Sequence, residues 1–286
     1  MNILVTGASG LIGKGVSLYL LEQGHCITGL VNNSLATITH KNYTEVKIDL
    51  LNTELKTNTL YYDAVIHCAA ALPSKYNFDE GKIVELGQKI DQNVFNYCLK
   101  NNFRIIHLSA AYLYQDREFL DENVPLRQDL KGYYLSKKKS EDFLLENSSK
   151  HVIFRISSPY GDLEKQTNVM RIFADKIKAG LPVTLIGDGG RKQNFIHIQD
   201  IANACLLALK NSVNGIYNLT FEKSYSMLEL ASAIKRIYNS KSDLLFERDK
   251  EDTQANVNFN NNKLKNEFSW TPAIDLESGL LKTLST

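Results

Sequence analysis

The first thirteen residues constrain the fold more than any other stretch of the chain. A short apolar run at residues 2–5, Asn-Ile-Leu-Val, is followed by Thr-Gly-Ala-Ser-Gly-Leu-Ile-Gly at 6–13 and by a helix-like segment at 14–23. This order predicts a buried strand that turns sharply into a helix. Gly7 would allow the tight turn, Gly10 would let backbone N–H groups approach a pyrophosphate, and Gly13 would let the helix pack close to the sheet. With the positive end of the helix dipole beside them, these features predict a dinucleotide site.

Length and charge exclude several classes of protein. A chain of 286 residues can bury a large core, either as one α/β unit or as a cofactor domain with a smaller lobe. The 33 basic and 32 acidic side chains give a net charge of +1 without a sustained block of one sign. Nothing in this pattern indicates a nucleic acid or an anionic membrane as partner.

The four cysteines, Cys26, Cys68, Cys98 and Cys205, are far apart, and each stands among apolar residues. They predict buried thiols in a reducing compartment, without a disulfide framework or a metal site. The chain starts directly with the first strand, and its most apolar later run, 201–209, is too short to cross a membrane. We therefore expect a cytoplasmic protein.

Three further strands are predicted in the first half of the chain. The strand at 26–31 ends in Asn32, which carries no charge to choose between NAD and NADP. The strand at 45–50 contains Asp49, a partner for the adenine amino group or, equally, a turn-capping carboxylate. The strand at 64–71 ends in small alanines that permit a ligand to approach. His67, inside that apolar run, is more readily explained as a core histidine than as a catalytic one.

Tyr133 and Lys137 are the first candidates for chemistry. They follow a predicted helix at 82–101 and a strand at 104–109, and they stand four residues apart, on one face of a helix. An ammonium near a phenol favours the phenolate, which suits a tyrosine that gives and takes a proton. Later segments predict a strand at 215–219 and helices at 227–238 and 275–284.

Together these segments resemble the extended short-chain dehydrogenase/reductase family of nucleotide-sugar epimerases, dehydratases and reductases. The matching stretches, in chain order, are 6–13, His-Cys-Ala-Ala at 67–70, Tyr-Tyr-Leu-Ser-Lys at 133–137 with Glu141, Phe-Arg at 154–155, Pro-Tyr-Gly at 159–161, Gly-Asp-Gly at 187–189, Phe-Ile-His-Ile-Gln-Asp at 195–200 and Phe-Ser-Trp-Thr-Pro at 268–272. They cover nearly the whole chain.

The resemblance implies a role for each candidate on the cofactor side. Tyr133 would exchange a proton with the sugar while NAD or NADP exchanges hydride at the same carbon, and Lys137 would bind the nicotinamide ribose. Tyr134 is the alternative tyrosine, out of register with Lys137. The implied cofactor-binding residues are Gly7, Ser9, Gly10, Leu11, Ile12, Asn32, Asp49, Leu50, Ala69, Ala70, Ala71, Ser109, Tyr133 and Lys137.

Two departures from the family pattern bear on catalysis. Ala110 stands where the family has a serine or threonine that hydrogen-bonds the reacting oxygen, and loss of such a donor costs a few kcal/mol of transition-state stabilisation. Ser109, one residue earlier, is a candidate catalytic residue that would compensate, as would Tyr112 or a water. The family's Asn-x-x-Gly-Thr pattern is replaced by Gly87, Ile90 and Asp91.

On the substrate side the resemblance implies a set of residues near a sugar diphosphate. They are Ser158, Asn168, Arg191, Gln193 and Arg248. Gln193 replaces an arginine of the family pattern, and arginine is the residue best suited to a diphosphate. Without the resemblance, Arg191 and Arg248 would be read as surface charges.

The expected fold class is α/β, a doubly wound parallel sheet of the Rossmann type with a smaller, discontinuous C-terminal substrate lobe. Residues 1–164 with 194–220 would form the NAD(P)-binding domain, and 165–193 with 221–286 the lobe. The expected function is 4-keto reduction or epimerisation of a nucleotide-activated sugar. The alternatives are a catalytically impaired NAD(P) sensor and a reductase of a small non-nucleotide carbonyl compound. Relatives also suggest a homodimer through the helices near 82–101 and 133–146.

Overall fold

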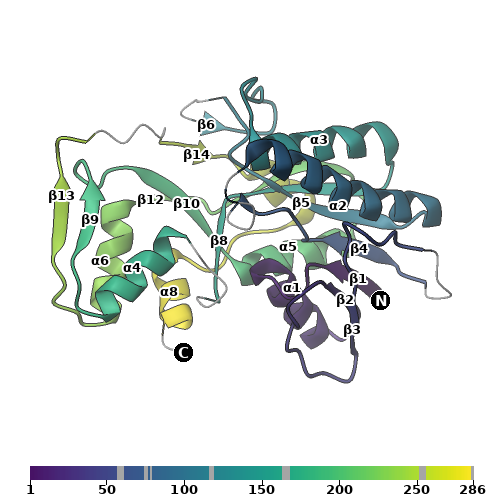
Figure 1. The fold of residues 1–286 in the computed structure, drawn as a ribbon, viewed down its shortest axis with the longest axis horizontal. Coiled ribbons are helices and arrows are strands. Elements are labelled where there is room, and N and C mark those ends of the chain that lie inside the picture. Colours follow the sequence, from purple (N-terminus) through teal and green to yellow (C-terminus); the bar gives the residue numbers. More distant parts are fainter. Residues whose placement is uncertain are drawn as a thin grey trace.

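A seven-stranded parallel sheet forms the centre of the molecule (Figure 1). The computed structural model describes residues 1–56, 61–73, 77, 79–115, 119–162, 168–250 and 256–284. The strands of the large sheet are β1 (Asn2–Thr6), β2 (Cys26–Val31), β3 (Tyr43–Lys47), β4 (Ala64–His67), β5 (Arg104–Ala110), β7 (His151–Ile156) and β11 (Gly215–Leu219). Their spatial order is β11-β7-β5-β4-β1-β2-β3, and every neighbouring pair is parallel. The strand order reverses beside β1, where doubly wound sheets bind their ligands.

Helices cover both faces of this sheet (Figure 1). On one side lie α1 (Leu11–Glu22) and α5 (Ile198–Lys210), and on the other α2 (Glu80–Asn101) and α3 (Gly132–Asn147). The alternation of side chains along β1 feeds two cores: Ile3 and Val5 pack with residues of α1 and α5, while Leu4 packs with residues of α2. The prediction of a doubly wound α/β fold is therefore confirmed.

A second group of elements packs around its own apolar core, on the left in Figure 1. It comprises β8 (Ser158–Tyr160), α4 (Val169–Lys178), β9 (Val183–Ile186), β10 (Lys192–His197), β12 (Ser224–Ser226), α6 (Met227–Ile237), β13 (Leu244–Glu247) and α8 (Leu276–Leu284). Its core contains Phe173, Ile177, Leu230, Ile234 and Leu280. The exact boundaries between the two parts stay a prediction.

Smaller elements join these two parts. The short strands β6 (Phe119–Leu120) and β14 (Asn258–Phe259) pair with each other, and α7 (Asn262–Phe268) packs near β11. Asp200 in α5 holds the segment that leads to α8: its carboxylate accepts the N–H groups of Ala273 and Ile274 at 2.9 and 3.2 Å.

Three details of the sequence prediction were wrong. The third strand is Tyr43–Lys47, so Asp49 lies after it, and β4 ends at His67, so the three alanines follow the strand. Cys26 is exposed and Cys68 partly exposed, whereas Cys98 and Cys205 are buried as predicted. Cys26 begins β2 and lines a cavity of about 190 Å³ at the amino ends of the strands, beyond the cover of the helices.

No helix among the described residues is long and apolar enough to cross a membrane.

Candidate active site

The turn between β1 and α1 has the geometry that its glycines predicted. Gly7 has a φ of +65°, and a Cβ on it would lie 2.8 Å from the backbone nitrogen of Ala69. A Cβ on Gly13 would lie 2.2 Å from the Gly7 carbonyl oxygen, so the helix packs directly on the turn. Gly10 differs from both, because a Cβ there would meet only the Gly7 oxygen, at 3.3 Å. The turn is thus closed on its inner side and open at Gly10.

The first turn of α1 is free to bind an anion. Gly10 is its N-cap residue, and no side chain caps the helix. The first N–H groups of a helix lack partners within the helix, so Leu11 and Ile12 stand where uncapped donors and the positive dipole end face a phosphate.

Helix α3 brings Tyr133 and Lys137 together. The Lys137 ammonium lies 5.7 Å from the centre of the Tyr133 ring, and Lys137 is only 3 % exposed. Tyr134 is 40 % exposed, and its ring packs edge-on against that of Tyr133 with 5.7 Å between the ring centres. The structure therefore pairs Lys137 with Tyr133, as the register argument predicted, although the catalytic role of either residue stays a prediction.

Lys137 has an unusual environment for a buried cation. No hydrogen bond to its ammonium is found within the described part of the chain; there it lies over the face of the Tyr133 ring, and its charge acts on Asp91 of α2. A buried ammonium is costly unless its protons are accepted by other groups. The hydroxyls of a ribose would supply such acceptors.

Ser109 and Ala110 end β5 with different surroundings. The Ser109 hydroxyl donates to Glu141 Oε1 of α3 at 2.5 Å. The same carboxylate is held by Arg155 of β7, whose Nη2 lies 2.6 Å from Glu141 Oε2. The single proton of Ser109 is thus engaged away from Tyr133, which makes it a poor substitute for the hydroxyl that Ala110 lacks. Its proposed catalytic part is untested.

Asn32 and Asp49 meet at the end of β2. Asn32 Nδ2 lies 3.4 Å from Asp49 Oδ1, and the Asp49 carboxylate also accepts the N–H of Leu51 at 3.0 Å and the Asn52 amide at 2.6 Å. The turn-capping interpretation of Asp49 is therefore confirmed, while its contact with adenine stays a prediction. Leu50 is buried beside it. In the folded protein, the neutral Asn32 therefore has the carboxylate of Asp49 beside it.

The alanines that follow β4 lie against the turn. The backbone N–H groups of Cys68 and Ala69 donate to Thr6 Oγ1 at 3.2 and 3.1 Å. Ala70 is partly exposed and Ala71 is buried. Ser9, in the turn itself, is also partly exposed. Small side chains thus lie against the turn, at the strand end where close approach of a ligand was predicted.

The predicted substrate residues are distributed across the second part of the molecule. Gln193 Nε2 donates to Ser158 Oγ at 2.5 Å, which joins β10 to β8. Asn168 caps α4 by accepting the N–H groups of Met170 and Arg171. Arg191 lies against the Met227 sulfur at 3.3 Å. Arg248 is exposed after the end of β13.

Tyr112 is a site residue that the sequence identified only as a substitute donor. Its phenol oxygen accepts the Asn194 N–H at 3.2 Å. Burial raises the pKa of Tyr112, while hydrogen bonds with Asn194 and Ser158 oppose that shift. Tyr112 therefore belongs to the same polar group as Ser158 and Gln193, which its sequence position did not reveal.

These features define a class: a doubly wound α/β protein with a dinucleotide-binding turn and a tyrosine–lysine pair beside it. The open Gly10, the uncapped helix and the buried Lys137 without a hydrogen-bonding partner among the described residues all fit a pyridine dinucleotide. Residues 3–220 match the family described as the NAD dependent epimerase/dehydratase family. The chain belongs to this family and is an NAD-dependent enzyme of the short-chain dehydrogenase/reductase type.

Curated relatives match over almost their full length. The chain is 28% identical to a UDP-glucuronate 4-epimerase of Thermodesulfobacterium geofontis, with 99% of this chain and 94% of the relative covered. It is 25% identical to a dTDP-4-dehydro-6-deoxyglucose reductase of Escherichia coli, with 100% and 97% covered. The fold matches a UDP-N-acetylglucosamine 4-epimerase of Methanobrevibacter ruminantium, solved with UDP-N-acetylmuramic acid, with a TM-score of 0.85, 24% identity, and 99% and 97% coverage.

Proposed function

We propose that this enzyme epimerises a nucleoside-diphosphate-linked hexose at C4 with NAD as its bound cofactor. The observation that carries the proposal is the placement of Tyr133 and Lys137 on α3, with the ammonium 5.7 Å from the centre of the phenol ring. The relatives support the class of substrate, because both act on nucleotide-linked sugars by name. They do not favour a sensor or a reductase of small carbonyl compounds.

In this proposal the phenol of Tyr133 moves the proton. As the phenolate, it would take the proton from the C4 hydroxyl and later return it to the C4 oxygen; bound NAD would supply the hydride chemistry at C4. The Lys137 ammonium stabilises the phenolate and holds the ribose beside it. Asp49 favours NAD over NADP, since its carboxylate next to Asn32 would repel a 2′-phosphate.

The second part of the molecule would hold the nucleotide. Arg191 and Arg248 would bind the diphosphate, and Asn168 would orient the start of α4 toward it. Ser158 and Gln193 would contact the sugar, because they lie with Tyr112 in one polar group. We also expect pairing as a homodimer and a cytoplasmic location.

A second candidate, reduction of a 4-keto sugar, is favoured by the match to the dTDP-4-dehydro-6-deoxyglucose reductase. The two reactions differ in their use of cofactor. An epimerase returns its hydride and consumes no NADH, whereas a reductase oxidises one NADH or NADPH for each product.

The experiment is incubation of the purified enzyme with UDP-glucose, UDP-glucuronic acid, UDP-N-acetylglucosamine and dTDP-4-keto-6-deoxyglucose, followed by NMR of the sugar products. Formation of the C4 epimer without change in absorbance at 340 nm supports the proposal. Stoichiometric loss of that absorbance with the keto sugar supports the reductase. Binding of NAD without turnover of any of the four sugars contradicts both.

A further inference from the structure

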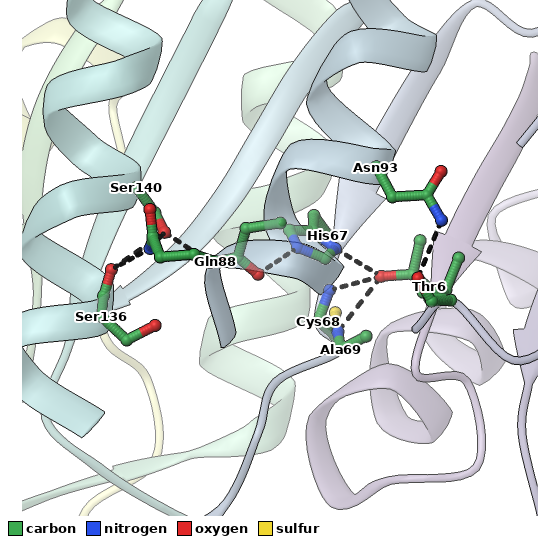
Figure 2. Close-up of polar contacts among 10 residues, drawn as sticks. Thr6, His67, Cys68, Ala69, Gln88, Asn93, Ser136 and Ser140 are labelled. Carbon is green, nitrogen blue, oxygen red and sulfur yellow. Dashed lines mark hydrogen bonds and ion pairs between the residues drawn. The ribbon is translucent and has the colours of Figure 1, made fainter. Parts of the chain in front are cut away.

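A chain of buried hydrogen bonds connects the glycine-rich turn to helix α3 (Figure 2). Thr6 Oγ1 lies 2.7 Å from His67 Nδ1, and His67 Nε2 lies 2.8 Å from Asp91 Oδ1. Ser140 Oγ of α3 then donates to Asp91 Oδ2 at 2.5 Å and itself accepts from Gln88 at 3.0 Å. Asp91 stands at the last position of the family's Asn-x-x-Gly-Thr pattern, where a threonine is expected.

The donors along this chain can be assigned from the groups present. Thr6 Oγ1 already accepts the N–H groups of Cys68 and Ala69, so both of its lone pairs are used and its own proton must go to His67 Nδ1. His67 is therefore a neutral imidazole that carries its proton on Nε2 and donates it to Asp91. Because Ser140 donates to the other oxygen, Asp91 accepts on both sides and is a carboxylate.

Among the described residues, one cationic side chain, Lys137, acts on this carboxylate. Asp91 is 2 % exposed, and the charged or titratable groups that face it are His67 from β4, His107 from β5 and Lys137 from α3. His107 is fully buried, and both of its ring nitrogens lack hydrogen-bond partners among the described residues. Burial first, and then the charge of Lys137, hold the pKa of His107 well below its usual value, so it is neutral. Lys137 is left as the countercharge.

The effect on Asp91 agrees with this assignment. Burial alone would raise the pKa of Asp91, but the Lys137 charge, followed by the His67 hydrogen bond, lowers it below its usual value. Geometry also brings the two groups to the same place: Lys137 stands three residues before Ser140, on the same side of α3, and Ser140 is the residue that donates to Asp91. Two buried residues of opposite charge thus face each other across α2 and α3 without a direct ion pair. Neither would be stable in its ionised form without the other.

We propose that Asp91 is a positioning residue that neutralises Lys137 and thereby makes the site favour the oxidised dinucleotide. The inference rests on the proposed function, because it places the nicotinamide near Lys137. The oxidised nicotinamide ring is a cation and the reduced ring is neutral. With Asp91 ionised, its negative charge cancels the positive charge of Lys137. Without Asp91, the Lys137 charge alone would repel the cationic nicotinamide ring. Such a preference suits an enzyme that begins each turnover with NAD.

The first test compares Asp91→Asn with Ser140→Ala. Asparagine keeps the size of Asp91 and can still accept from His67, but it has no charge; the Ser140 variant keeps the charge and loses one hydrogen bond. Dissociation constants for NAD and NADH are measured by calorimetry on protein freed of cofactor. We expect Asp91→Asn to raise the ratio of the NAD constant to the NADH constant by roughly fivefold or more. Ser140→Ala should leave that ratio within about twofold, since it removes no charge.

An unchanged ratio in Asp91→Asn would overturn the proposal. If the wild-type enzyme binds neither dinucleotide, the proposed function fails instead, and the countercharge is then judged by a second measurement that needs no cofactor. This measurement also serves if Asp91→Asn does not fold.

The second test follows the thermal unfolding of Lys137→Met without cofactor from pH 5 to pH 8. Loss of the ammonium leaves Asp91 buried without a countercharge, so its folded pKa rises above the unfolded value. The folded state then binds more protons than the unfolded state, and stability falls as the pH rises. The deficit in Tm relative to wild type should widen toward pH 8 and be constant in the Asp91→Asn/Lys137→Met double variant. A deficit in Lys137→Met that is the same at every pH would show that Lys137 is not the countercharge.

Discussion

The two halves of the proposed site differ in how far the folded chain has already assembled them. On the cofactor side, hydrogen bonds through His67 link Thr6, at the start of the turn, to the buried carboxylate of Asp91, and Lys137 is buried on the facing helix α3. On the substrate side, Arg248 is exposed and Asn168 is engaged in capping its own helix. The first half is preorganised for one ligand, whereas the second offers groups that a ligand would have to bring together.

This difference has a physical origin. The cofactor side is built at the carboxyl ends of adjacent parallel strands, where backbone hydrogen bonds fix the position of each residue that follows. The substrate side depends on short strands and chain ends, such as Arg248 after β13, that carry few constraints. We expect substitutions on the cofactor side to affect chemistry and folding, and those on the substrate side to affect affinity.

The largest effect is expected at Tyr133. Tyr133→Phe removes the proton donor and acceptor and should lower kcat by about 100- to 10,000-fold while NAD still binds, since general acid–base groups contribute on that scale. Tyr134→Phe is the matched control: it keeps the ring that packs edge-on against Tyr133 and removes only a hydroxyl that is out of register with Lys137, so kcat should stay within about twofold of wild type. Turnover is measured by NMR of the sugar product. A greater loss of kcat in the Tyr134 variant would reverse the assignment and make Tyr134 the residue that moves the proton.

Two glycines of the same turn are expected to have different roles: Gly13 contributes to the stability of the fold and Gly10 to the binding of NAD. In Gly13→Ala the new methyl group would overlap the Gly7 carbonyl, so the free energy of unfolding should fall by about 2–3 kcal/mol. In Gly10→Ala the methyl group would lie 3.3 Å from the Gly7 carbonyl oxygen, a contact that a small shift relieves, so stability should fall by only about 1 kcal/mol, while the methyl group obstructs the pyrophosphate and weakens NAD binding. Urea unfolding and calorimetry measure the two effects. Equal stability losses would mean that the turn is not closed on one side only.

Sequence reasoning reached the features that depend on local spacing. The turn at 6–13 and the pairing of Lys137 with Tyr133 follow from intervals of a few residues, and both are present in the structure. The doubly wound α/β fold class followed from the succession of predicted strands and helices. These predictions succeeded because backbone geometry alone relates the residues concerned.

The partners of buried polar groups could not be predicted in the same way. Asp91 is 24 residues from His67 and 49 from Ser140, and their contact depends on how α2 packs on both the sheet and α3. Ser109 likewise finds Glu141 only in the folded chain. Cys26 was expected to be buried because its neighbours are apolar, but it is exposed at the start of β2, where it lines a cavity. Sequence shows that a polar residue will need a partner, not which residue supplies it.

On the substrate side, Arg248 tests whether the dispersed residues act on a nucleotide at all. Arg248→Ala should raise KM for the nucleotide sugar by about three- to tenfold, the value of one charged hydrogen bond at an exposed site, without changing the NAD dissociation constant. Lys250→Ala is the control, because Lys250 lies two residues away and pairs with Glu247. Steady-state kinetics and inhibition by UDP report the effect. Equal changes in both variants would indicate a general charge effect and no specific phosphate contact.

Ala110 is the last residue of β5, and its substitution tests whether the folded site already holds every hydrogen-bond donor that the reaction needs. Ser109 cannot replace the missing donor without leaving Glu141, so Ala110→Ser should raise kcat by about three- to tenfold, as expected for a restored hydrogen bond to the reacting oxygen. Cofactor affinity, measured by calorimetry, should not change. An unaltered kcat would show that another group, such as Tyr112, already supplies the donor.

The smallest effect concerns His197, the last residue of β10, where the second part of the molecule passes into α5. Its Nδ1 accepts the Gln199 N–H at 3.2 Å, and burial, followed by the charge of Lys282, lowers its pKa to about 4. An unfolded histidine binds its proton near pH 6.5, so between these values the unfolded state holds more protons and stability falls as the pH falls. His197→Asn keeps a capping acceptor but cannot titrate. The stability lost between pH 7 and pH 4.5, measured by urea unfolding, should therefore shrink by up to about 1 kcal/mol after allowance for solvent screening. An identical loss of stability in both proteins would show that protonation of other groups causes it and that His197 at this junction contributes none of it.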